Sequence, residues 1–324
     1  MKRILVIAAA ALALVAQAQS FPGSKPISIV VPFAAGGPTD KVARDLGVAM
    51  AKTLPGGNFV VENVAGAGGT IGASKVARAN PDGHTLLLFH IGMAATPALY
   101  RKLSYKPLED FEFLGMVNDV PMTLIGRPTL PANNFKELAT WIEQNKGKVN
   151  LGNAGLGAAS HLCGLLFQDA IKTDMTTVPY KGTAPAMNDL MGGQIDLLCD
   201  QTTNTTSQIE GKTVKAFAVT TLKRLNTPAL KNLPTLDESG LKGFEVTIWH
   251  GLYAPKGTPA DVTAKINKAL KAALKDPEFI KKQQGLGAVV VTDKRTEPAE
   301  HKKFVTSEIA KWGPIIQEAG VYAD

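Results

Sequence analysis

The stretch Ile29-Val30-Val31-Pro32-Phe33-Ala34-Ala35-Gly36-Gly37-Pro38-Thr39-Asp40 predicts a strand, a loop of small residues and the start of a helix. Consecutive β-forming apolar residues are typical of a strand that is buried on both faces, as in a parallel sheet. Gly37 suits the N-cap, Pro38 fits the first helical position, and the Asp40 carboxylate can reach back to free N–H groups. This arrangement can hold an anion, although a tight packing turn is the alternative.

The residues around this stretch repeat the alternation of strands and helices. We expect strands at 29–33, 59–63 and 85–89 and helices at 39–53 and 70–79, which together form an open parallel sheet. If its strand order begins 2-1-3, a ligand binds beyond the carboxyl ends of the strands, between the loops at 34–38 and 90–93.

A second α/β block follows, and the chain then returns to the first. Strands are expected near 123–126, 149–152, 176–179, 195–199 and 214–219, with helices near 135–145, 158–170, 183–191 and 203–209. An extended run at 244–254, a strand at 288–292 and a helix from Pro298 follow. Thr183 and Thr258 are expected helix caps. The predicted fold is therefore α/β with two doubly wound domains, 19–120 plus 246–324 and 121–245, joined by two crossings that form a hinge.

The N-terminal residues predict a secretory signal. Lys2 and Arg3 precede an apolar run too short to span a bilayer, and Ala16-Gln17-Ala18 supplies a small-x-small cleavage site. We therefore expect cleavage after residue 18 and a protein exported to the periplasm. A formal charge of +7 without Lys/Arg clusters among aromatic residues argues against nucleic acid and fits an anionic small molecule.

The sequence contains two cysteines, Cys163 and Cys199. In an oxidising compartment a lone pair favours a disulfide, and two buried free thiols are the alternative. We predict that the two residues pair within the second domain.

The segment 150–161 repeats the arrangement of the opening stretch, with a strand, a glycine-rich loop and a helix start. It nearly matches a dinucleotide fingerprint, but Ser160 stands where the third glycine belongs. A cradle for a small anion is therefore favoured over an NAD site, and a packing turn remains the alternative.

Catalytic machinery is not recognisable in the sequence. Ser160 and His161 are adjacent, so on a helix they point about 100° apart and cannot form a nucleophile–base pair. The histidines lack metal-ligand spacing. Asp196 and Asp200 share one face of a predicted strand, where a structural or hinge role competes with ligand binding. We expect no catalytic residue, no metal and no cofactor.

Several ordered motifs carry a family resemblance. They are Val31-Pro32-Phe33 before Gly36-Gly37-x-x-Asp40, Val61-Glu62-Asn63 before Gly66-Ala67-Gly68-Gly69, Pro81-Asp82-Gly83, Gly152 to His161, and Val178-Pro179-Tyr180-Lys181-Gly182 followed by Gly192-Gly193-Gln194-x-Asp196. Together they resemble the Bug family, the substrate-binding proteins of tripartite tricarboxylate transporters. The resemblance implies a type II periplasmic binding protein of the Venus-flytrap sort that delivers a small carboxylate to a membrane permease.

The resemblance and the strand ends together give a set of candidate ligand-binding residues. They are Phe33, Ala35, Gly36, Gly37, Thr39, Ala67, Gly68, Gly69, Thr70, His90, Ile91, Asn153, Gly155, Gly157, Ala158, Ser160, Tyr180, Thr183, Asp200 and Trp249. Backbone N–H groups and hydroxyls are expected to hold the carboxylate, while His90, Tyr180 and Trp249 meet an apolar or aromatic body. We expect a monomer. An exported enzyme acting on a small anion and a ligand-presenting component of a membrane sensor are the alternatives.

Overall fold

The structure is a computed structural model that describes residues 21–320 and 322. The predicted signal segment lies outside the described residues. The strands are β1 Ile27–Val31, β2 Phe59–Asn63, β3 Thr85–His90, β4 Phe111–Gly126, β5 Asn150–Asn153, β6 Thr176–Pro179, β7 Leu197–Gln201, β8 Lys215–Val219, β9 Thr247–Pro255 and β10 Val289–Val290. The helices are α1 Pro38–Ala51, α2 Thr70–Ala77, α3 Gly92–Leu99, α4 Phe135–Gln144, α5 Ala159–Ile171, α6 Thr183–Met191, α7 Thr202–Glu210, α8 Ala260–Ala273, α9 Pro277–Gly285 and α10 Pro298–Glu318. Short 3₁₀ turns occupy Ala67–Gly69 and Lys294–Thr296.

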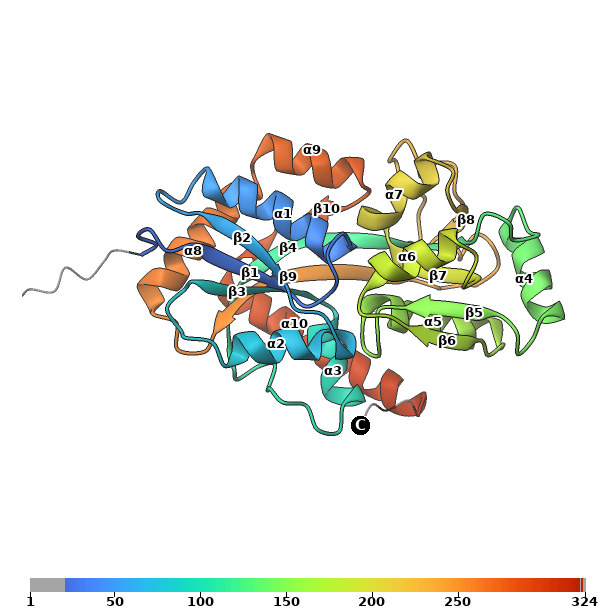
Figure 1. Ribbon diagram of the computed structural model, residues 1–324, viewed down its shortest axis with the longest axis horizontal. Coiled ribbons are helices and arrows are strands. Elements are labelled where there is room, and N and C mark those ends of the chain that lie inside the picture. Colours follow the sequence, from blue (N-terminus) through green and yellow to red (C-terminus); the bar gives the residue numbers. More distant parts are fainter. Residues whose placement is uncertain (1–20, 321, 323–324) are drawn as a thin grey trace, which may run out of the picture.

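One long strand, β4, joins the two halves of the sheet. The strand order is β2-β1-β3-β9-β4-β7-β5-β6, with β8 and β10 also pairing with β4. The first part of β4 pairs with β9, and its last residues pair with β7 and β8. Figure 1 shows the resulting two lobes. We call β1–β3, β9, β10, α1–α3 and α8–α10 the first lobe, and β5–β8 with α4–α7 the second lobe.

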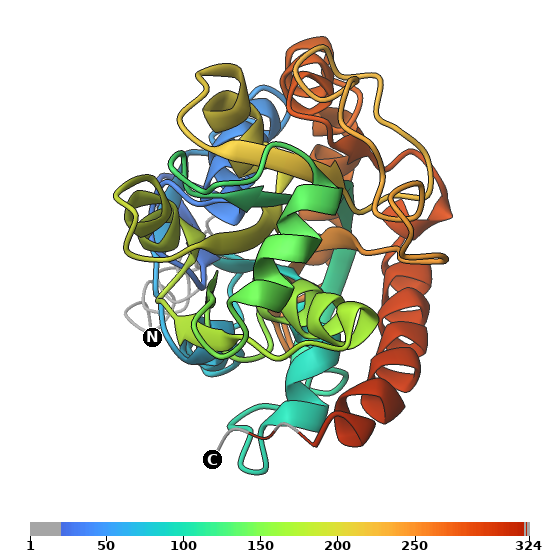
Figure 2. The same ribbon diagram turned by 90° about the vertical axis from the view of Figure 1, so that its right-hand side faces the viewer.

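The first lobe is a sheet covered on both faces by helices. In Figure 1, α1 and α9 lie on one side of the sheet, and α2, α3 and α10 lie on the other. Figure 2 shows α10 running along one flank toward α3, against which it packs. Residues on β1 and β3, such as Ile29 and Leu87, have no exposed surface, as expected for strands between two helical layers.

The predicted start of the strand order, 2-1-3, is confirmed, and so is the return of the chain to the first lobe. The predicted strand at 288–292 is present as β10, which pairs with Asn118 and Asp119 of β4. The domain boundaries at 120 and 246 stay predictions, although the pairing of β4 changes beside the first of them. Thr220 bonds to a residue beside each of these two boundaries. Its N–H and its hydroxyl bond to the Met122 carbonyl, and its hydroxyl also bonds to the Val246 carbonyl.

Other expectations were wrong. The sheet of the first lobe is not purely parallel, because β9 lies antiparallel between β3 and β4. The helices α3 and α9 and the first half of β4 were not predicted. Gly182 and Pro259, rather than Thr183 and Thr258, occupy the N-cap positions of α6 and α8. The Thr258 hydroxyl instead donates to the Pro255 carbonyl.

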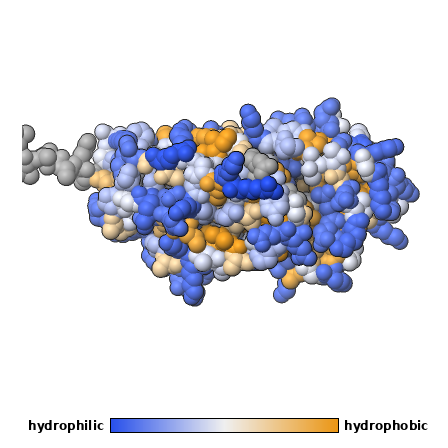
Figure 3. Space-filling view, turned by 90° about the horizontal axis from the view of Figure 1, so that it is seen from below, coloured by the Kyte–Doolittle hydropathy of each residue, from blue (hydrophilic) through white to orange (hydrophobic). Residues whose placement is uncertain are grey.

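One face of the molecule is mostly polar. Figure 3 shows this face, on which hydrophilic residues dominate and hydrophobic residues form only small patches. Within residues 21–320, no helix combines the length and the apolar composition needed to cross a bilayer.

The predicted disulfide is confirmed. Cys163 of α5 and Cys199 of β7 are bonded, with their Cα atoms 6.1 Å apart and a sequence separation of 36. Both side chains are buried.

We expect reduction of this disulfide to lower the free energy of unfolding by about 3–4 kcal/mol, because the reduced unfolded chain regains the entropy of an open loop. Urea titrations with and without reductant measure the difference. A variant with both Cys163→Ala and Cys199→Ala is the control, since its stability should not respond to reductant. Equal stability of the oxidised and reduced protein would rule out this contribution.

Candidate ligand-binding site

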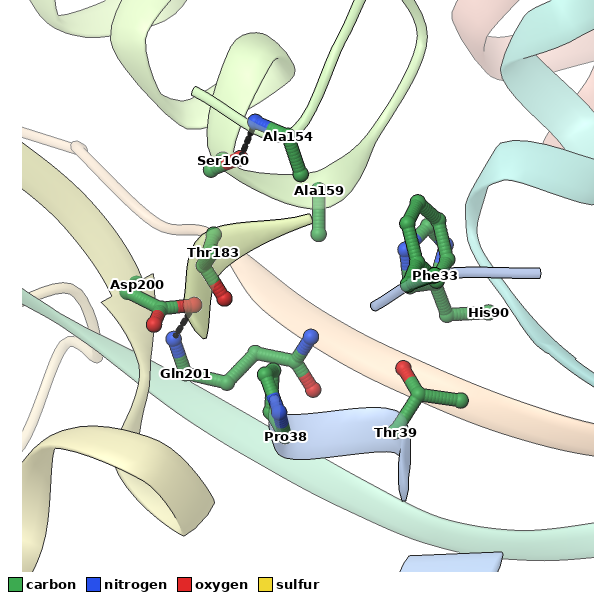
Figure 4. Close-up of a pocket in the computed structure, with 10 residues that line it drawn as sticks. All are labelled: Phe33, Pro38, Thr39, His90, Ala154, Ala159, Ser160, Thr183, Asp200 and Gln201. Carbon is green, nitrogen blue, oxygen red and sulfur yellow. Dashed lines mark hydrogen bonds between the residues drawn. The ribbon is translucent and has the colours of Figure 1, made fainter. Parts of the chain in front are cut away.

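A small pocket lies between the two lobes (Figure 4). It is lined by Phe33, Pro38, Thr39, His90, Ala154, Ala159, Ser160, Thr183, Asp200 and Gln201. These residues lie at or just beyond the carboxyl ends of β1, β3, β5 and β7, or in the first turns of α1, α5 and α6. This is the edge at which ligands bind in open α/β sheets.

The first-lobe loop is shaped by the Asp40 carboxylate, as predicted. Gly37 is the N-cap of α1, Pro38 is its first residue, and the Gly36 N–H donates to Asp40 at 2.9 Å. Burial alone would raise the pKa of Asp40, but hydrogen bonds from Arg44, Gly36 and Asn63 hold that pKa below its ordinary value. Because the Gly36 N–H is already used, it is not a free donor for a ligand.

His90 presents a neutral ring to the pocket. Its ring stacks on Phe33 with the centroids 4.8 Å apart, and its Nδ1 accepts from the Gly92 N–H at 3.0 Å. Burial and the neighbouring His250 lower the pKa of His90 well below its ordinary value. A neutral imidazole whose Nδ1 accepts carries its proton on Nε2, so His90 is a hydrogen-bond donor.

The second-lobe loop is less open than the sequence predicted. Its N–H groups are taken by its own side chains: Ala154 donates to Ser160 Oγ at 2.8 Å, Gly155 to Asn153 Oδ1 at 2.8 Å, and Gly157 to His161 Nδ1 at 3.3 Å. The Ser160 oxygen therefore accepts from within the loop, which leaves its hydroxyl proton for a ligand. The backbone N–H groups in the first turn of α5 still point toward the N-terminal end of this helix, where Ala159 and Ser160 line the pocket.

Asp200 and Gln201 form the wall at the end of β7. Asp200 is 1% exposed and accepts from the Gln201 N–H and from Asn204 Nδ2. Burial raises the pKa of Asp200 to about 6, although these two hydrogen bonds, the Thr183 hydroxyl and the charge of Lys41 act in the opposite direction. Asp200 is therefore mostly ionised at pH 7, and the second lobe contributes a negative charge to the pocket.

Two buried polar atoms at the pocket, Gln201 Oε1 and Thr183 Oγ1, make no hydrogen bond of ordinary geometry within the part of the chain that the structure describes. The Thr183 hydroxyl nevertheless faces Asp200 closely enough to lower the pKa of that carboxyl. Figure 4 shows both side chains directed into the space between the lobes. Buried polar groups are costly unless they are hydrogen-bonded, so Gln201 Oε1 points to a polar ligand.

The lobes touch around the pocket. The Ala34 N–H donates to the Lys181 carbonyl at 2.9 Å, and Lys41 Nζ donates to Asn204 Oδ1 at 3.1 Å. Tyr100 Oη donates to the Leu156 carbonyl at 3.0 Å. The structure therefore has the two lobes closed over the pocket. Lys41 was not among the predicted residues, and it lies beside the pocket rather than in its lining.

The candidate residues divide into two groups. Phe33, Thr39, His90, Ser160, Thr183 and Asp200 line the pocket. Four further residues line the pocket: Pro38, Ala154 and Ala159, which lie inside the predicted ligand-binding loops without having been singled out, and Gln201, which was missed. Gln201 could have been found, because it stands between a strand end and a helix start, like the residues that were chosen.

None of Ala67, Gly68, Gly69 and Thr70 belongs to the lining. Gly69 faces Phe33 and Phe89 of its own lobe, and Thr70 donates to the Ala67 carbonyl, whereas Gly68 lies at the contact between the lobes. Gly68 packs against the Leu156 carbonyl, and Gly155 packs against Gly68. The remaining small-residue candidates support the loops. Ala35 and Gly36 are exposed, and Gly37 faces Ala184. Ile91 and Ala158 are the N-caps of α3 and α5, Asn153 ends β5, and Gly155 and Gly157 lie in the loop between β5 and α5.

The two large aromatic candidates are directed elsewhere. The Trp249 indole donates to Glu308 of α10 at 2.9 Å and packs edge-on against Phe304. The Tyr180 hydroxyl donates to Asp189 at 2.7 Å. Neither residue lines the pocket, so the structure offers no aromatic wall at these positions for an apolar ligand body.

Two α/β lobes closed over a small polar pocket define a solute-binding protein. The family described as Tripartite tricarboxylate transporter family receptor matches residues 42–321, and the chain belongs to this family. It is similar to the UPF0065 protein in the TAR-I ttuE-ttuC' intergenic region of Agrobacterium vitis, with 50% identity covering 98% of this chain and 90% of that relative.

Solved structures agree with this assignment. The periplasmic binding protein BugD is 54% identical with a TM-score of 0.89, covering 92% of this chain and 99% of that chain. MatC from Rhodopseudomonas palustris, solved with bound malate, is 39% identical with a TM-score of 0.85, covering 90% and 98%. The predicted family and the periplasmic-binding-protein fold are therefore confirmed.

Proposed function

We propose that this protein captures a small organic carboxylate between its lobes in the periplasm and delivers it to the membrane permease of a tripartite transporter. In this proposal it is exported through the signal segment 1–18, acts as a monomer and has no enzymatic activity. The two lobes correspond to the predicted domains, and the crossings near residues 118–121 and 243–250 act as the hinge.

The observation that carries this proposal is a closed pocket rich in neutral hydrogen-bond donors. Ser160 and His90 each have a proton to offer, and the N-termini of α1 and α5 add partial positive charge. No Lys or Arg belongs to the lining as described. Neutral donors and helix termini suit a carboxylate, and a relative of this chain has been solved with malate.

The competing function is an enzyme that acts on the same small anion. Asp200 is the residue that favours it, because a buried carboxyl with a pKa of about 6 resembles a general base. Against it, Asp200 is held in place by hydrogen bonds from the Gln201 N–H and from Asn204, which suits a structural role.

Native mass spectrometry with a panel of small carboxylates, malate included, separates the two functions. We expect one equivalent of ligand per chain, recovered chemically unchanged after prolonged incubation. Conversion of the bound compound to a product would support the enzyme instead. Failure of every carboxylate to bind would refute the proposed function.

A further inference from the structure

A chain of buried side chains runs from the surface of the first lobe to Thr39 in the pocket. Gln283 Nε2 donates to Asp45 Oδ2 at 3.3 Å, and Asn118 Nδ2 donates to Gln283 Oε1 at 2.8 Å. His250 Nδ1 lies 2.8 Å from Asn118 Oδ1, and His250 Nε2 lies 3.2 Å from Thr39 Oγ1. We call these five residues the relay.

The relay has a defined direction, because Asp45 at its outer end can only accept. The amide nitrogen of Gln283 must face Asp45, so its oxygen is left to accept from the Asn118 nitrogen. The Asn118 oxygen is then left for His250 Nδ1, which must donate to it. Both amides therefore donate through their nitrogen toward Asp45 and accept through their oxygen from the next residue toward the pocket.

His250 carries this orientation to the pocket. It is fully buried, and burial lowers its pKa to about 3, so the ring is neutral and has a single N–H. With the proton on Nδ1 facing Asn118, Nε2 is an acceptor, and the Thr39 hydroxyl must donate to it. Thr39 therefore presents only oxygen lone pairs to the pocket.

Asp200 is a second acceptor across the pocket. Figure 4 places Thr39 and Asp200 on opposite sides, with the Gln201 side chain extending between them. Ser160 and His90 offer protons instead, whereas the Gln201 amide adds a further acceptor, its buried Oε1, which has no hydrogen bond among the described residues. The pocket thus combines donors suited to a carboxylate with acceptors that a plain carboxylate cannot satisfy, and unpaired acceptors in a closed pocket are costly.

We infer that the ligand is a carboxylate that also carries a hydrogen-bond donor, a hydroxyl or an ammonium group, which Thr39 and Asp200 recognise. The inference rests on the proposed function and adds a specificity to it. Thr39 is the specificity-determining residue in the first lobe. His250, Asn118 and Gln283 are positioning residues that set the direction of its hydroxyl.

Calorimetry with matched ligand sets tests the inference. Succinate, malate and aspartate share a four-carbon skeleton with no donor, a hydroxyl or an ammonium group, and propionate, lactate and alanine form the corresponding three-carbon set. In the better-bound set, we expect the hydroxyl or the ammonium compound to bind at least about 10-fold more tightly than the plain acid, the worth of one hydrogen bond. Which of the two binds more tightly identifies the donor.

Thr39→Val removes the acceptor and keeps the shape of the side chain. We expect it to bring the preference for a donor-bearing ligand down to about twofold or less. Thr258→Val is the matched control, because Thr258 is another buried threonine, and its hydroxyl donates to the Pro255 carbonyl of its own turn. This control should keep the wild-type preference.

Asn118→Leu tests the relay itself. Without the Asn118 oxygen, His250 is free to carry its proton on Nε2 and donate to Thr39, whose hydroxyl then turns toward the ligand as a donor. We expect the ratio of affinities to shift toward the plain acid. If this variant does not fold, as judged by its thermal transition, Thr39→Val alone decides.

Two results would overturn the inference in different ways. Equal binding of the plain, hydroxyl and ammonium acids by the wild type would refute the donor specificity and leave the proposed function standing. Failure of all six compounds and of other small carboxylates to bind would refute both.

Discussion

Gly68→Ala is expected to weaken ligand binding by at least about 100-fold, equivalent to about 2.7 kcal/mol, while the protein stays folded. A methyl group on Gly68 would lie 1.8 Å from the Leu156 carbonyl oxygen of the other lobe. A backbone atom of a tight loop cannot move aside as a flexible side chain does. The variant can therefore relieve the overlap only by keeping the lobes apart, which leaves the pocket open to water.

The backbone of Gly68 requires a matched control, because its φ of 61° is left-handed and disfavours alanine. Gly193 has a φ of 77°, and nothing lies within 4 Å of the position that its Cβ would take. Gly193→Ala should show a similar loss of stability, about 1–2 kcal/mol, with wild-type ligand affinity.

Small-angle scattering complements the affinity measurement. We expect the wild type and Gly193→Ala to become more compact at saturating ligand, and Gly68→Ala to remain extended. If Gly68→Ala bound ligand as tightly as the control and compacted to the same degree, closure at this contact would not be part of binding.

Local sequence signals predicted the parts of the fold that depend on local interactions. The apolar run before Gly37-Pro38 and the Asp40 carboxylate define β1 and α1 without help from distant residues. The insertion of β9 between β3 and β4 has no such signal. It depends on Tyr253 pairing with Leu87 on one side and Phe113 on the other, residues far apart in the sequence.

The site shows the same division. Phe33, Thr39 and Ser160 were found because each stands beside a strand end or a helix start. The relay could not be found, since it joins Thr39 to Gln283 through side chains that only the packed first lobe brings together. The expectation of bare loops was wrong for a local reason. Asn153, Ser160 and His161 are polar residues close enough to bond to the N–H groups of their own turn.

The proposed function depends most on how the pocket holds negative charge. The donors are the Ser160 hydroxyl, the Nε2–H of His90 and the N-terminus of α5, and the described lining contains no cationic side chain. Hydrogen bonds to a charged group contribute roughly 1.5–3 kcal/mol each. A primary amide replaces one accepting oxygen with an NH₂ group that faces these donors and also removes the charge that the helix terminus attracts.

Calorimetry with the best-bound acid and its primary amide measures this difference directly. We expect the amide to bind at least about 100-fold more weakly than the acid, with the wild-type thermal transition unchanged in the absence of ligand. An amide that binds within about threefold of the acid would contradict this expectation, because the pocket would then recognise shape without the carboxylate charge.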